Sequence, residues 1–129
     1  MARILVIDDE ESIRTALRRA LEMDDHEVSV AEDGEEGERL FRENPADLVI
    51  VDIIMPKKEG VEVVKDLVTD YPDIKVIMMS GGARMAEGDE LEFLLEVAMS
   101  HGANKTFMKP FDLVEMMEAV RELLGESAD

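Results

Sequence analysis

Short β-branched runs alternate with longer segments of helical periodicity along the whole chain. Runs such as 4–7 and 48–51 are short, apolar and rich in β-branched residues, as expected for strands. Between them, apolar residues recur at intervals of three and four, the pattern of a helix with one buried face. This alternation predicts a parallel sheet covered by helices. The expected strands are 4–7, 28–30, 48–51, 74–79 and 106–108, and the five expected helices lie near 13–21, 35–42, 61–68, 91–98 and 113–124.

The size and charge of the chain exclude several classes of function. Its 129 residues suit one compact domain with a sizeable core. A formal charge of −18 argues against binding to nucleic acid or anionic lipid, because repulsion would slow every encounter. There is no cysteine, and His26 and His101 are far apart in the sequence, so no zinc site is expected. No apolar run is long enough to span a membrane, and no signal peptide is visible. We therefore expect a cytoplasmic protein without nucleic-acid or membrane partners.

Many of the acidic residues have an ordinary structural explanation. Asp33, Asp89 and Asp112 each stand at a predicted helix start and precede a glutamate by three residues. In this arrangement the aspartate accepts hydrogen bonds from amides that have no partner within the helix. Asp8 or Asp9 has the same explanation, as a cap for the helix that follows. Each acid taken alone therefore carries no functional meaning.

Five polar residues nevertheless converge at one edge of the predicted sheet. Asp8 and Asp9 follow the first strand, Asp52 the third, Ser80 the fourth and Lys109 the fifth. In an open parallel sheet, ligands bind at the carboxyl ends of the strands, near the point where the strand order reverses. Separate caps and turns do not readily explain five such residues after four different strands. The pattern therefore predicts a functional site at this edge.

The residue types at this edge suit phosphoryl transfer. Two unit charges about 4 Å apart repel by about 4 kcal/mol at an effective dielectric of 20, so clustered aspartates favour binding of a divalent cation. An all-oxygen site beside a phosphoryl group suits Mg²⁺. Lys109 offers a positive charge and Ser80 a hydroxyl to the transferring group. We interpret Asp52 as the nucleophile, which becomes an acyl phosphate.

With these residues in place, the chain resembles the CheY-like receiver domain of two-component response regulators over essentially its whole length. The motifs are specific in combination, whereas a lone Met-Pro or Lys-Pro pair would be weak. The resemblance implies a flavodoxin-like (βα)5 fold, an α/β architecture with a doubly wound parallel five-stranded sheet in the order 2-1-3-4-5. The matching motifs are Asp8-Asp9, Asp52-x-x-Met55-Pro56-x-x-x-Gly60, Ser80-Gly81 and Lys109-Pro110-Phe111.

The resemblance also implies a role for each matching residue. Asp52 is the expected phosphorylation site, and Lys109 and Ser80 are the expected catalytic and switch residues. The peptide bond before Pro110 is expected to be cis, which agrees with the confinement of cis bonds largely to proline. The implied Mg²⁺ ligands are Asp9, Asp52 and the main-chain carbonyl of Ile54, with Asp8 acting mainly through bound water.

The function implied by the resemblance is signalling. We expect residues 1–125 to form the receiver domain, with 126–129 as a short tail and no output domain. A histidine kinase or a histidine phosphotransfer protein would supply the phosphoryl group, and a separate protein or self-association would read it. The protein would be a monomer or a weak, phosphorylation-dependent dimer. We do not expect an enzyme, beyond catalysis of its own phosphoryl transfer and dephosphorylation.

The chain departs from the receiver pattern close to the predicted site. Receivers usually carry an aromatic switch residue three positions before the lysine, where this chain has Thr106. Phe107 would face the other side of its strand, so we expect it in the core and a modified switch at Thr106. The glycine-rich stretch 81–88 is longer than usual and predicts a mobile loop that forms part of the partner surface. We also expect Ile54 to limit the access of hydrolytic water, so Ile54→Asn should change the rate of dephosphorylation.

Three other functions are compatible with parts of the pattern. An aspartyl-phosphate phosphatase would need a second acid two residues after the nucleophile, where this chain has Ile54. An electron-transfer protein of the same topology would need a cofactor phosphate loop after the first strand, where the run from Asp8 to Glu11 would repel phosphate. A receiver-like binding module that signals without phosphorylation remains open. Covalent labelling of Asp52 by acetyl phosphate distinguishes a receiver that is phosphorylated from such a binding module.

Overall fold

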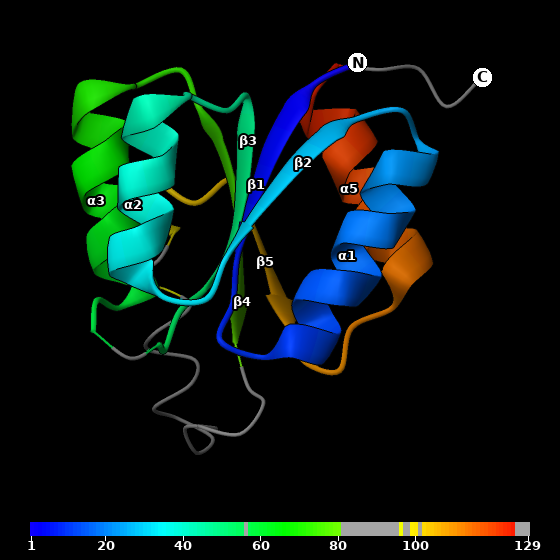
Figure 1. Ribbon diagram of the computed structural model, residues 1–129, viewed down its shortest axis with the longest axis horizontal. Helices are drawn as coiled ribbons and strands as arrows, with labels where there is room; N and C mark the ends of the chain where they lie inside the picture. The colour runs from blue at the N-terminus through cyan, green and yellow to red at the C-terminus, as the bar shows by residue number, and fades with distance from the viewer. Residues whose placement is uncertain (56, 81–95, 97–98, 101, 126–129) are drawn as a thin grey trace.

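The computed structural model describes residues 1–55, 57–80, 96, 99–100 and 102–125. Within these residues, five parallel strands form one sheet in the order β2-β1-β3-β4-β5, as the sequence predicted (Figure 1). The loop 81–88 lies outside the described residues, as does the helix expected near 91–98 except for Glu96. The strands are β1 (Arg3–Ile7), β2 (Glu27–Ala31), β3 (Leu48–Asp52), β4 (Lys75–Ser80) and β5 (Lys105–Met108), and the helices are α1 (Glu11–Met23), α2 (Gly34–Glu43), α3 (Gly60–Asp70) and α5 (Leu113–Leu123).

Helices cover both faces of the sheet, with α1 and α5 on one side and α2 and α3 on the other (Figure 1). Successive side chains of a strand point to opposite faces, so each strand contributes to two cores. In β1, Ile4 and Val6 pack in the core shared with α1 and α5, whereas Leu5 and Ile7 pack in the core shared with α2 and α3. All five residues of β3 are buried. This double burial explains the continuous apolar runs in the sequence.

The register of the strands brings the predicted site residues to one edge. Asp52, the last residue of β3, pairs with Met79 of β4, and Ser80 of β4 pairs with Met108 of β5. Asp8 directly follows β1, and Lys109 directly follows β5. The carboxyl ends of four strands therefore place an acid, a hydroxyl or a lysine at the same level of the sheet.

Two of the predicted helix caps are present in the described residues. The Asp33 carboxylate accepts a hydrogen bond from the Glu36 amide at 2.8 Å, and the Asp112 carboxylate accepts from two amides at the start of α5. Neither Asp8 nor Asp9 is the N-cap of α1: that residue is Glu10, whose side chain makes no capping hydrogen bond. Asp8 is therefore available for another role. Asp89 lies outside the described residues.

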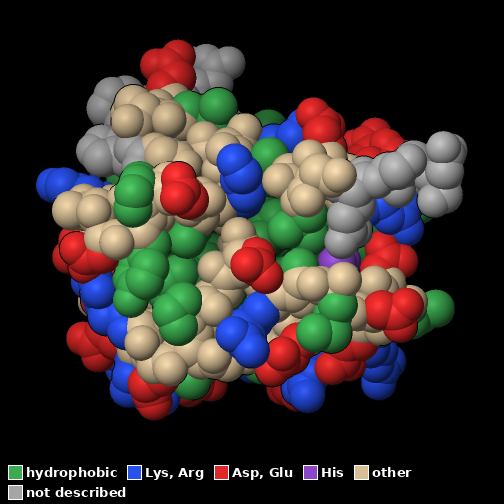
Figure 2. All heavy atoms as spheres, turned by 90° about the horizontal axis from the view of Figure 1, so that it is seen from above, with side chains coloured by type: hydrophobic (Ala, Val, Ile, Leu, Met, Phe, Trp, Pro, Cys, Tyr) green, Lys and Arg blue, Asp and Glu red, His purple; other side chains and the backbone are tan. Residues whose placement is uncertain are grey.

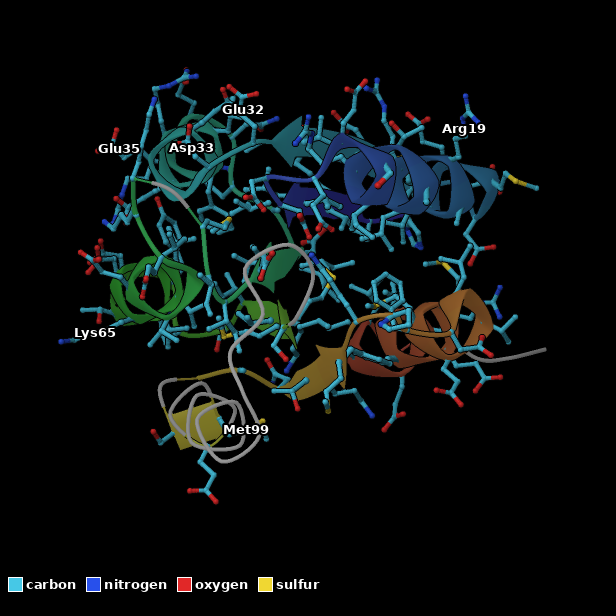
Figure 3. The ribbon with its side chains drawn as sticks, turned by 90° about the horizontal axis from the view of Figure 1, so that it is seen from below. Arg19, Glu32, Asp33, Glu35, Lys65 and Met99 are labelled. Carbon is cyan, nitrogen blue, oxygen red and sulfur yellow. The ribbon has the colours of Figure 1, made fainter. Side chains whose placement is uncertain are left out.

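At the edge of the molecule where the chain begins, charged side chains alternate with apolar patches (Figure 2). This edge lies opposite the carboxyl ends of the strands, which is the edge seen in Figure 3. None of the helices in the described residues is long and apolar enough to cross a membrane.

Candidate functional site

Lys109 lies among carboxylates at the carboxyl edge of the sheet. Its Nζ atom is 2.7 Å from Asp8 Oδ2, 3.0 Å from Asp52 Oδ2 and 3.3 Å from Glu10 Oε2. The side chains of Lys109, Asp8 and Asp52 are at most 5% exposed, and Glu10 lies at the rim. We call these four residues the Lys109 cluster. They come from the ends of β1, β3 and β5, and the fold joins Lys109 to Glu10, for example, across 99 positions of the sequence.

Burial dominates the electrostatics of the two inner aspartates. Loss of hydration raises the pKa of Asp52 to about 6, and the nearby charge of Asp8 adds to this rise. Lys109 and the hydrogen bond from the Ile54 amide oppose it but do not cancel it. Burial likewise raises the pKa of Asp8, against the opposing effect of Lys109. Negative charge in this site is therefore only partly compensated by the protein's own groups.

Lys109 itself remains a cation. Burial alone would lower its pKa, but its interactions with Asp8 and Asp52 outweigh burial and raise it above the ordinary value for lysine. A lysine held in this state supplies a fixed positive charge beside the Asp52 carboxylate at neutral pH. Such a charge is suited to meeting the oxygens of a phosphoryl group.

Asp8, Asp9 and Asp52 fit a hard divalent cation. One carboxylate oxygen of each lies within 4.8 Å of the others. Mg²⁺ prefers oxygen ligands and commonly binds through one or two carboxylates together with phosphate oxygens and water. Ile54, the fourth expected contributor, directly follows the buried Ile53, and its amide donates to Asp52 Oδ1 at 3.2 Å. The three carboxylates and their partly compensated charge fit Mg²⁺, and binding of the ion stays a prediction.

Ser80 brings an unsatisfied hydroxyl to the same edge. It is 1% exposed, and its Oγ atom has no hydrogen-bond partner among the described residues. A buried polar atom without a partner costs free energy and is an unusual feature of a folded protein. Its main-chain carbonyl accepts a hydrogen bond from the Lys109 amide at 2.7 Å, so Ser80 and Lys109 are adjacent. This hydroxyl is suited to donate to an incoming ligand. The Lys109–Pro110 peptide bond is cis.

Two residues that contact the site were not predicted from the sequence. Glu10 pairs with Lys109, and Arg14 of α1 donates a hydrogen bond from Nη1 to the main-chain carbonyl of Asp8 at 2.7 Å. The Glu10 amide in turn donates to Asp8 Oδ1 at 2.8 Å. The acidic run after β1 is only weak evidence for a contact of Glu10 with Lys109, because the sequence does not show which of these acids reaches the lysine. Arg14 has no signal other than its place in the first turns of α1.

Thr106 and Phe107 lie on opposite faces of β5. Thr106 pairs with Met78, which belongs to the core shared with α2 and α3, whereas Phe107 pairs with Met79 of the other core. Phe107 packs against that second core, as expected, and its ring contacts Phe111 edge to face. Thr106 is partly exposed on the side of the sheet that α2 and α3 cover. Its role in switching stays a prediction.

Comparison with known proteins gives one consistent family. The model of the response regulator receiver domain matches residues 4–121. Response regulator MprA of Mycobacterium sp. (strain KMS) is 32% identical over 126 residues, which cover 98% of this chain and 52% of MprA. Protein CcdB of Bacillus subtilis (strain 168) is 32% identical over 126 residues, which cover 97% of this chain and 99% of CcdB. The chain thus spans about half the length of MprA.

Solved structures agree with the sequence matches. A response regulator receiver domain protein from Clostridium thermocellum is 33% identical, with a TM-score of 0.81 over 97% of this chain and 95% of its own. A CheY-like receiver domain protein from Methanospirillum hungatei JF-1 is 28% identical, with a TM-score of 0.84 over 97% of this chain and 94% of its own. The similarity extends over nearly the whole length of both structures.

Proposed function

The chain belongs to the response regulator receiver family, and on that premise we propose that it accepts a phosphoryl group on Asp52. The donor is a histidine kinase or a histidine phosphotransfer protein. The observation that carries the proposal is the 3.0 Å distance between Lys109 Nζ and Asp52 Oδ2 at the end of β3, inside a cluster of carboxylates. A nucleophilic carboxylate beside a fixed cation, with an unsatisfied hydroxyl nearby, suits an incoming phosphoryl group.

The transfer needs no reactant other than the phosphohistidine donor and water. A carboxylate oxygen of Asp52 forms a bond to phosphorus while the phosphorus–nitrogen bond of the donor phosphohistidine breaks. The bonding electron pair remains on the histidine nitrogen, which takes up a proton from water. Lys109 faces the oxygens of the transferred group, and the Ser80 hydroxyl donates a hydrogen bond to one of them. Lys109 already lies 3.0 Å from the Asp52 carboxylate before the donor arrives.

Asp8, Asp9, Asp52 and the Ile54 carbonyl are the residues that would hold Mg²⁺. When bound, the ion offsets negative charge on the phosphoryl oxygens and on the aspartates. The protein's part is to keep Asp52 ionised and oriented. The Ile54 amide and Lys109 do this by binding different oxygens of the Asp52 carboxylate.

The phosphorylated form signals by binding another protein or a second copy of the chain, in the cytoplasm. We expect a monomer that at most forms a weak dimer after phosphorylation. The response is a movement around Ser80 toward the phosphoryl group, with Thr106 in place of the usual aromatic switch. Beyond its own phosphorylation and dephosphorylation, the protein has no catalytic role in this proposal.

Labelling with acetyl phosphate and Mg²⁺, followed by intact-mass analysis, tests the proposal. The wild-type chain should gain the mass of one phosphoryl group, and Asp52→Asn should gain none. Asp73→Asn is the matched control, because Asp73 is an exposed aspartate outside the site. Wild-type protein that stays unlabelled under conditions in which a known receiver is labelled would favour the binding module that signals without phosphorylation. Steady turnover of phosphate esters would favour the phosphatase.

A further inference from the structure

The loop between β3 and α3 is closed tightly beside Asp52. The Ile53 amide donates to the Met79 carbonyl at 2.8 Å, and the Gly60 amide donates back to the Ile53 carbonyl at 2.8 Å. A β-carbon at Gly60 would lie 2.0 Å from the Asp52 carbonyl oxygen, so the backbone approach leaves no room for a side chain. Ile53 is therefore fixed to β4, and Gly60 is fixed to Ile53. The Ile54 carbonyl, an expected ligand of Mg²⁺, lies within this loop.

The second half of the loop carries conformational strain. Lys57 has a φ of 68°, in the left-handed region that costs a non-glycine residue about 1 kcal/mol or more. Such a conformation persists only where surrounding contacts hold it. Two contacts are present here. Lys57 Nζ lies 3.7 Å from Asp33 Oδ2, and the carbonyl oxygen of the next residue, Lys58, lies against α2, where a β-carbon at Gly34 would approach it to 2.0 Å. The backbone of Lys58 is thus packed against the first turn of α2.

The side chain of Lys58 connects the loop to two helices. Its Nζ atom is 2.9 Å from Glu38 of α2 and 2.5 Å from Asp66 of α3. Lys58 is only 17% exposed, and its ammonium lowers the pKa of Asp66. Glu38 also lies 3.7 Å from Arg42, which pairs with Asp70 at 2.8 Å. We call these five residues the Lys58 network.

We propose that Lys58 is a positioning residue for the Mg²⁺ site: its bridge between α2 and α3 holds the β3–α3 loop in the shape that presents the Ile54 carbonyl to the ion. Asp66 and Glu38 act through Lys58, and none of the three touches the ion. The proposal rests on the proposed function, because it assigns Mg²⁺ to the carboxylates beside Asp52. It adds a part of the molecule, the facing sides of α2 and α3, that the site itself does not include.

Simple electrostatics predicts the opposite effect from the one proposed. Removing a positive charge from a protein that binds a cation should strengthen binding, because less repulsion remains. Loss of a positioning residue should weaken binding, because the loop no longer holds its carbonyl in place. Outer residues that orient metal ligands typically change affinity by roughly 10- to 100-fold. The sign of the change therefore separates the two explanations.

The central test compares Lys58→Met with Lys65→Met by titration calorimetry with MgCl2. Methionine keeps the length of the side chain but cannot bind the two carboxylates. Lys65 is exposed on α3 and points away from the protein, so its variant has the same charge change without the bridge (Figure 3). We expect Lys58→Met to bind Mg²⁺ roughly tenfold more weakly, at the low end of the range for outer residues. Lys65→Met should bind as the wild type does, or slightly more tightly.

A second pair of variants guards against misfolding of Lys58→Met. Asp66→Asn removes one end of the bridge at a side chain that is 42% exposed, and Glu62→Gln makes the same charge change on the same helix. Asp66→Asn should weaken Mg²⁺ binding several-fold more than Glu62→Gln. Hydrogen exchange of residues 53–59 in Mg²⁺-free buffer should also be faster in Asp66→Asn than in Glu62→Gln. If circular dichroism shows that Lys58→Met is unfolded, this pair decides.

Mg²⁺ affinity and loop exchange that are equal within each matched pair would overturn the proposal. So would tighter binding by Lys58→Met. Failure of the proposed function has a different signature, because wild-type protein would then remain unlabelled by acetyl phosphate. Loop exchange in the absence of Mg²⁺ still reports on the bridge in that case. The failures of the two proposals can therefore be told apart.

Discussion

Two lysines of this protein each bind carboxylates from different elements, but at different degrees of burial. The Lys109 cluster lies at the end of the sheet, where Lys109 and Asp52 are 5% and 4% exposed. The Lys58 network lies between α2 and α3, where Lys58 is 17% and Asp66 42% exposed. The distances are similar, yet the effects on the acids are opposite. Burial raises the pKa of Asp52 to about 6, whereas Lys58 lowers the pKa of Asp66.

This difference shows that the geometry of an ion pair does not define its role. In the Lys109 cluster, the free energy lost by desolvating several carboxylates exceeds the free energy gained from their attraction to one lysine. The site therefore destabilises the fold unless a further cation binds. In the Lys58 network, water still reaches Asp66 and Asp70, which are 42% and 52% exposed, so these acids lose less hydration. The first arrangement suits binding and reaction, and the second suits orientation of a loop. The predictions below compare the two directly.

The largest effect should follow from removing each lysine in turn. Lys109→Met leaves Asp8 and Asp52 buried without their cation and should lower the free energy of unfolding by about 3 kcal/mol. Lys58→Met should lower it by no more than about 1 kcal/mol, because its partners regain water. Urea denaturation of both variants in Mg²⁺-free buffer at neutral pH measures the difference. Equal losses would remove the distinction between the two regions.

The sequence predicted that Asp8, Asp52 and Lys109 of the Lys109 cluster come together, but it predicted none of the contacts of the Lys58 network. In the sequence, Asp52 and Lys109 each directly follow a predicted strand, and parallel pairing places all such strand ends at one edge. The Lys58 network depends instead on how α2 faces α3, and hydrophobic periodicity gives only the buried face of each helix. Contacts from Lys58 to Glu38 and Asp66 join positions 20 and 8 residues apart without any regular spacing. Glu10 was missed for a related reason, because its side-chain direction depends on the turn before α1.

The second prediction concerns pH. Since the pKa of Asp52 is raised to about 6, the folded protein holds this proton more tightly than the unfolded chain does. This carboxyl therefore contributes stability that is fully present below about pH 4 and is lost as the pH rises through about 6. Asp52→Asn has no charge to bury at this position. Its free energy of unfolding should therefore exceed that of the wild type by roughly 2 kcal/mol at neutral pH without Mg²⁺. The excess should shrink toward about pH 4.

Urea denaturation at a series of pH values measures this excess, and Asp66→Asn is the comparison. The pKa of Asp66 is lowered by Lys58, so its carboxylate contributes stability above the unfolded pKa and loses it as the pH falls through the folded value. Asp66→Asn should therefore be the less stable variant at neutral pH. A difference of the same sign at both aspartates would contradict the contrast between buried and exposed acids.

Mg²⁺ should stabilise the wild type through the Lys109 cluster. A ligand that binds only the folded state, present at about ten times its Kd, adds about 1.4 kcal/mol to the free energy of unfolding. The gain should be largely lost in Asp52→Asn and retained in Asp73→Asn, whose aspartate lies outside the site. Thermal melts with and without MgCl2 measure it. Equal gains in all three proteins would indicate nonspecific binding to a chain of charge −18.

The smallest effect separates the regions by their response to salt. A double-mutant cycle between Lys58 and Asp66 should give a coupling energy of about 0.5 kcal/mol, because the pair is partly exposed. About 1 M NaCl shortens the screening length to about 3 Å and should remove most of that coupling. The cycle between Lys109 and Asp52 should be larger and change little, because counterions cannot approach a pair that is at most 5% exposed. Salt-insensitive coupling at Lys58 would mean that water is excluded there as well, and the network would then resemble the site that it supports.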